Sequence, residues 1–68
     1  MMAMAKRMMD ETVRTLGFEH EETIKVAEAY GEYCFAVEAG QPERMAYDNL
    51  YRAYLWAMTV YRLEMEEE

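Results

Sequence analysis

The segment ERMAYDNLYRAYLWAMTVYRLEM, residues 43–65, decides the fold of this chain. Placed on a helix at about 100° per residue, its apolar side chains sweep an arc of roughly 240°. A helix on the surface of a monomer usually buries an apolar stripe little wider than about 100°. This helix therefore needs cover on two sides. The sequence predicts that one of the two covering surfaces belongs to another protein chain.

The apolar arc divides into two rows of different chemistry. One row has mostly small side chains, which let a neighbouring helix approach closely: Ala46, Leu50, Ala53, Ala57 and Val60. The other has large, adaptable side chains at coiled-coil spacing: Tyr47, Tyr51, Tyr54, Met58, Tyr61 and Met65. We call the second set the tyrosine-methionine row. The small row is assigned to packing within the chain, and the tyrosine-methionine row to an oligomer interface, because Tyr and Met are enriched at protein contacts.

Packing within the chain is the alternative interpretation of the tyrosine-methionine row, with each ring in the core and each hydroxyl at its edge. Self-association is favoured over a foreign partner, because a permanently exposed apolar patch promotes aggregation and a two-fold contact covers it at once. The sequence therefore predicts an obligate homo-oligomer, most simply a dimer. Two antiparallel helix pairs would form its four-helix core, with the N-terminal helices on the flanks.

The first predicted helix covers about residues 2–16. Its apolar face is formed by side chains at helical spacing: Met2, Ala5, Met9, Val13 and Leu16. Gly17 is expected to end it in a left-handed cap. The second helix covers about residues 19–39 and contains Gly31, at a cost of about 1 kcal/mol relative to alanine. Either a backbone packs closely at Gly31 or the helix bends there.

The third helix covers about residues 42–66. Gly40 and Pro42 supply a stop and a restart, and a link this short forces the second and third helices to lie antiparallel. The predicted fold class is therefore all-α: a helical hairpin with an amphipathic N-terminal helix, in one domain of residues 1–68 that assembles into a dimeric bundle.

Composition narrows the possible functions. A chain of 68 residues is near the size at which a single core barely offsets chain entropy. One cysteine and one histidine exclude an internal disulfide and a Cys/His zinc site within one chain. A net charge of −7 repels phosphate backbones, so direct nucleic-acid binding is not expected. Neither a signal-peptide core nor a membrane span of about 20 residues is present, which favours a cytoplasmic protein without membrane contact.

The sequence predicts no catalytic residue, cofactor or metal ligand. Cys34 lies on the apolar face of the second helix, as a small buried hydrophobe does. His20 lies at a helix start among glutamates, where a capping or solvated role is expected. The Glu-x-x-His pair of dimetal bundles is absent, because Gly17 stands three residues before His20. Phosphate-binding loops and nucleophile turns are absent too, so the protein is not expected to be an enzyme.

The predicted function is therefore that of a regulator, adaptor or inhibitor that acts through protein contacts. One alternative is an acidic inhibitor that imitates a nucleic-acid backbone and occupies a basic groove on another protein. Its candidate residues are Glu19, Glu21, Glu22, Glu28 and Glu32. A further alternative is an oligomeric bundle that holds a small molecule or a metal ion.

Overall fold

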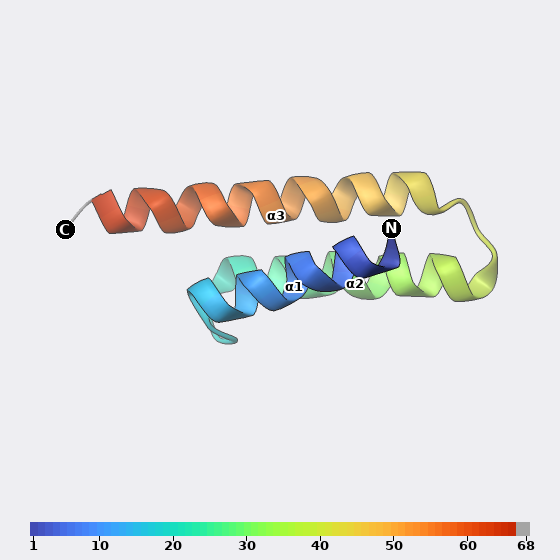
Figure 1. Cartoon of the computed structure of the whole chain (residues 1–68), viewed down its shortest axis with the longest axis horizontal. Coiled ribbons are helices and arrows are strands. Elements are labelled where there is room, and N and C mark those ends of the chain that lie inside the picture. Colours follow the sequence, from blue (N-terminus) through green and yellow to red (C-terminus); the bar gives the residue numbers. More distant parts are fainter. Residues whose placement is uncertain (67–68) are drawn as a thin grey trace.

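The protein folds into three α-helices that lie side by side (Figure 1). The computed structural model describes residues 1–66, with α1 at Met2–Leu16, α2 at Glu21–Ala39 and α3 at Glu43–Glu66. The most extensive contact joins α2 and α3, which run antiparallel, and α1 packs against both of them. The predicted all-α class, with its main contact between the second and third helices, is confirmed. The molecule is a rod of 45 × 18 × 17 Å.

Gly17 ends α1, as predicted, but with a different backbone geometry. Its φ is 87° and its ψ is 163°, outside the left-handed helical region of the expected cap. This extended conformation at positive φ is essentially restricted to glycine. The Gly17 amide still donates to the Val13 carbonyl at 2.9 Å. The chain therefore leaves α1 through a conformation that a side chain would strain.

His20 caps the N-terminus of α2 and contacts the C-terminal end of α3, which lies at the same end of the molecule. Its Nδ1 accepts a hydrogen bond from the Glu22 backbone amide at 3.0 Å. Its Nε2 lies 3.2 Å from both carboxylate oxygens of Glu64, near the end of α3. Because Nδ1 accepts a hydrogen bond, the ring proton of His20 is on Nε2, and Nε2 donates a hydrogen bond to the Glu64 carboxylate. The helix begins at Glu21 rather than near Glu19, because the imidazole supplies the capping acceptor.

The turn between α2 and α3 fixes the hairpin. Gly40 adopts the left-handed conformation, with φ 69° and ψ 22°. The Gln41 amide donates to the Ala36 carbonyl at 2.9 Å, which is the long-range bond of a Schellman cap. Pro42 directly precedes the first residue of α3, Glu43. This short turn returns α3 along α2, as the glycine and proline pattern predicts.

The core lies between the three helices and is small. Its buried apolar members are Ala5, Met8, Val26, Tyr33, Ala36, Leu50 and Ala57. Leu50 and Ala57 come from the small row of α3, in agreement with its assignment to packing within the chain, and Ala46 and Ala53 pack against this core. These small residues let α3 approach α2 closely.

The face of α1 that enters the core agrees in part with the predicted one. Ala5 is buried, and Met9 and Leu16 are half-buried and pack against the core, as predicted, whereas Met2 is exposed and the buried Met8 and Thr12 were not predicted. The Thr12 hydroxyl donates to the Met8 carbonyl at 2.8 Å, so its polar group is satisfied inside the helix. α1 packs against both α2 and α3. The side chains that lie between the helices therefore determine the rotation of α1 about its own axis.

Gly31 lies on the exposed side of α2. A Cβ placed on this residue would meet no atom of the chain within 4 Å. Close packing of a backbone within the chain therefore does not explain this glycine, although glycine weakens a helix interior by about 1 kcal/mol relative to alanine.

We expect substitution by alanine to have opposite effects at Gly31 and at Gly17. We expect Gly31→Ala to raise the free energy of unfolding by about 1 kcal/mol, because it restores helix propensity without a clash. We expect Gly17→Ala to lower it by about 1–3 kcal/mol through strain at positive φ. Urea denaturation followed by circular dichroism measures both effects. A destabilised Gly31→Ala protein would contradict the open surroundings of this residue.

Candidate protein interaction surfaces

The tyrosine-methionine row of α3 lies partly against the rest of its own chain. Tyr47, Tyr54 and Met58 are half-buried and pack against the core. Tyr61 is also half-buried, whereas Tyr51 and Met65 keep 47% and 55% of their surface exposed. Tyr47, Tyr54 and Met58 therefore pack within the chain, as in the alternative interpretation. Tyr51 and Met65 remain exposed.

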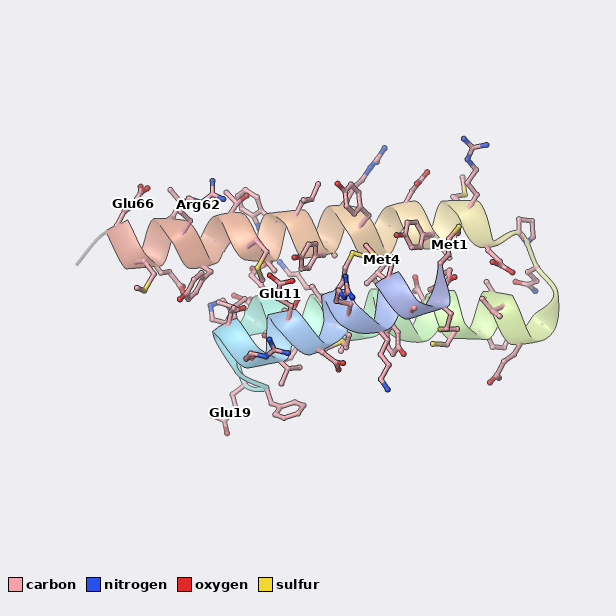
Figure 2. The ribbon with its side chains drawn as sticks, in the orientation of Figure 1. Met1, Met4, Glu11, Glu19, Arg62 and Glu66 are labelled. Carbon is pink, nitrogen blue, oxygen red and sulfur yellow. The ribbon has the colours of Figure 1, made fainter. Side chains whose placement is uncertain are left out.

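Tyr47 and Tyr54 hold α3 against different helices. The ring of Tyr47 meets Tyr33 of α2 edge to face, with centroids 5.7 Å apart and planes at 65°, a favoured geometry for aromatic pairs. The Tyr54 hydroxyl donates to Oε2 of Glu11 in α1 at 2.7 Å. Figure 2 shows Glu11 on the side of α1 that faces α3. The row thus supplies one contact to α2 and one to α1.

The hydroxyl of Tyr54 is held in its neutral form. Burial raises its pKa from 10.0 to about 12, and the hydrogen bond to Glu11 and the charge of that carboxylate act in the same direction. The cause is physical: an ionised phenol would lose hydration and would face a negative oxygen at hydrogen-bond distance. Tyr54 is therefore a donor to Glu11 at neutral pH.

An open depression occupies the surface beside the C-terminal half of the row, from Tyr54 to Met65. Its volume is about 490 Å³. It is lined by Glu11, Tyr54, Leu55, Met58, Tyr61, Arg62 and Met65, and we call it the tyrosine groove. Four of the six row members line it, together with one carboxylate and one guanidinium group.

The lengths of the helices explain why the tyrosine groove is open. The 15 residues of α1 span roughly 22 Å at about 1.5 Å per residue. The 24 residues of α3 span roughly 36 Å by the same rise. Figure 1 shows that the C-terminal end of α3 extends beyond the ends of α1 and α2. The last part of the tyrosine-methionine row therefore lies where α1 no longer covers α3.

A second groove runs between α2 and α3 on a side that α1 does not line. It has a volume of about 780 Å³. Its lining residues are Glu28, Gly31, Glu32, Phe35, Ala36, Gln41, Pro42, Met45, Ala46 and Asn49, and we call it the acidic groove. Phe35 is 61% exposed and Met45 is 74% exposed. The sequence prediction of an interface did not include this groove, although an apolar Phe35 beside a helical glycine was an available signal.

The candidate acidic residues divide between this groove and other places. Glu28 and Glu32 line the acidic groove, and helical spacing puts Glu21 on the same face. Glu22 is half-buried, with a carboxylate oxygen 3.6 Å from Nζ of Lys25. Glu19 precedes α2 and lies in the loop, away from α3 (Figure 2). The structure thus groups three of the five glutamates.

Cys34 is a half-buried free thiol. Within residues 1–66, no group of three or more His, Cys, Asp or Glu side chains is placed to hold a metal ion. No helix in this part of the chain combines the length and apolarity needed to cross a membrane.

Comparison with known proteins adds no assignment. The chain matches no protein family, no curated protein and no solved structure. The arguments about function therefore rest on the surfaces described above.

The Tyr54–Glu11 hydrogen bond predicts a stability difference that depends on pH. At pH 8 we expect Tyr54→Phe to lower the free energy of unfolding by about 1–2 kcal/mol, as for loss of a hydrogen bond to a charged group. The raised pKa of Tyr54 means that its contribution is complete below pH 10 and is lost as pH rises toward about 12.

Thermal denaturation of both proteins between pH 8 and pH 11.5 measures this difference, and the gap between their melting temperatures should narrow above about pH 10. A gap that stays constant across this range would contradict the proposed donor role of Tyr54.

Proposed function

We propose that this protein is a small helical module that acts through protein contacts, as a regulator, adaptor or inhibitor, and that it self-associates through the tyrosine groove, most simply as a dimer. The observation that carries the proposal is that four members of the tyrosine-methionine row, Tyr54, Met58, Tyr61 and Met65, line one open depression. Exposed Leu55 and Met65 line this depression, and exposed Tyr51 lies one helical turn before Leu55 on the same helix.

The amount of exposed apolar surface supports association. Among residues 1–66, twelve large hydrophobic side chains are exposed, whereas only seven apolar side chains are buried. Single exposed hydrophobic residues are normal on a protein, but contiguous patches mark contact sites. Leu55, Met58 and Met65 form such a patch together with Tyr54 and Tyr61.

Charge favours a second copy as the occupant of the tyrosine groove. Two chains that each carry a net charge of −7 repel one another, so their contact is least opposed where the surface is locally neutral. The tyrosine groove contains one acidic residue, Glu11, and one basic residue, Arg62. Tyrosine and methionine also supply the large, adaptable contact area typical of interfaces.

The acidic inhibitor is a second candidate function, and one observation favours it. Glu21, Glu28 and Glu32 are exposed and share a face of α2. Two of them, however, line a concave groove together with apolar Phe35 and Met45. A surface of this shape and mixed chemistry receives a partner better than it imitates a phosphate backbone.

Light scattering coupled to gel filtration at micromolar concentration tests the dimer. We expect the unmodified protein to show twice the chain mass, and the variant with Leu55→Asp and Met65→Asp to show the chain mass, because the contact would bury two charges per copy. Both residues are exposed within the chain, so the variant should keep its helical circular dichroism spectrum.

The matched control carries Met45→Asp and Leu63→Asp, two exposed apolar positions of the same helix outside the tyrosine groove. This control should remain a dimer. A monomeric unmodified protein overturns the proposal. So does a control that dissociates while the Leu55 and Met65 variant stays dimeric.

A further inference from the structure

The α2–α3 hairpin has an open side that resembles the side occupied by α1. An amphipathic helix, α1, lies along the hairpin and packs against both of its helices. The acidic groove lies between the same two helices, and no residue of α1 is among those that line it. Its walls are two antiparallel helices, which is the surface that accepts a further helix in helix-in-groove recognition.

At Gly31 the α2 side of the acidic groove carries no side chain. The residue lines the acidic groove, and the space that its Cβ would occupy is empty of chain atoms to 4 Å. A glycine in a helix interior is unfavourable unless close approach requires it. Outside the adjoining turns of α2, no atom of residues 1–66 lies within 4 Å of the position that a Cβ of Gly31 would take, so this position is open to the backbone of a partner.

The charge of the groove indicates the chemistry of the occupant. Glu28 and Glu32 are both exposed and line the groove, and its ten lining residues include no Lys or Arg. A second copy in a two-fold contact would bring four carboxylates together at a low local dielectric, which is costly. A partner with positive charge gains from the same arrangement.

The apolar part of the groove indicates that the partner is amphipathic. Phe35 and Met45 lie at the turn end of the groove and are largely exposed. Ile24 precedes Gly31 by seven residues on α2, and Trp56 follows Met45 by eleven on α3, so helical spacing puts both residues on the faces that line the groove, with Glu28 following Ile24 and with Asn49 and Arg52 between Met45 and Trp56. Ile24 and Trp56 are both exposed.

We infer that the acidic groove is a second interaction site and that its partner is a basic amphipathic helix of another protein. Apolar side chains of that helix pack on Phe35 and Met45, its backbone passes close to Gly31, and its Lys or Arg side chains pair with Glu28 and Glu32. This site is distinct from the tyrosine groove and does not depend on the dimer.

Fluorescence anisotropy with a labelled synthetic peptide tests the inference. The peptide has about 14 residues, roughly four helical turns, with leucines on one helical face and lysines elsewhere. We expect saturable binding to the full chain and no binding of the peptide in which glutamate replaces lysine. Phe35→Ala should weaken binding by about tenfold, as for a central aromatic contact.

Two pairs of variants separate groove binding from general attraction to an acidic protein. Glu28→Gln with Glu32→Gln should weaken binding by about threefold to tenfold, as for two partly exposed ion pairs. Glu19→Gln with Glu66→Gln removes the same charge at exposed positions outside the groove and should leave affinity unchanged. Gly31→Ala should weaken binding although the protein stays folded.

Equal losses in the two charge variants would show attraction by net charge alone and would overturn the inference. Equal affinity for the lysine and glutamate peptides would also overturn it. If Glu28→Gln with Glu32→Gln instead promotes formation of a larger oligomer in light scattering, the occupant is a second copy and the inference is wrong. None of these outcomes changes the test of the tyrosine groove.

Discussion

The apolar width of α3 is the constraint on which the positions of the other helices depend. The side with small residues packs closely on α2, where Leu50 and Ala57 are fully buried. The neighbouring side carries tyrosines, and α1 meets it through the hydrogen bond from Tyr54 to Glu11. Small side chains on α3 allow α2 to approach closely. The Tyr54 ring is large and carries a hydroxyl, which needs a hydrogen-bond acceptor, and Glu11 of α1 supplies it. The two-sided cover expected for α3 comes in part from its own chain.

Charge separates the two grooves that remain open. The tyrosine groove holds one acidic and one basic residue, whereas the acidic groove holds two carboxylates and no cation among its lining residues. A strongly acidic chain can meet a copy of itself only where repulsion is weak, and it attracts basic partners where carboxylates stand beside apolar surface. The distribution of charge therefore supports the two proposals, a second copy at the tyrosine groove and a basic helix at the acidic groove.

The sequence was sufficient to predict the three helices and the hairpin, because Gly17, Gly40 and Pro42 interrupt strong helical periodicity. It predicted the buried face of α1 only in part. Ala5, Met9 and Leu16 pack in or against the core as expected, but a helix that packs against two others buries a wider face, which also includes Met8 and Thr12. Periodicity does not show that Tyr47 and Tyr54 meet their own chain, since this depends on where a separate helix lies. The contact of His20 with Glu64 joins residues 44 positions apart and has no local signal.

The open surfaces follow from the lengths of the helices rather than from loose packing. A helix of 15 residues cannot run the full length of one of 24 residues, and a single helix fills only one of the two grooves of a hairpin. The C-terminal part of the tyrosine-methionine row and the side of the hairpin at Gly31 are both left without cover by α1. Gly31 is informative here because the isolated chain gains nothing from it. Gly31 weakens its own helix, and a Cβ at this position would meet no other element of the chain. A close neighbour outside the chain would explain this glycine, which supports the acidic groove as an interaction site.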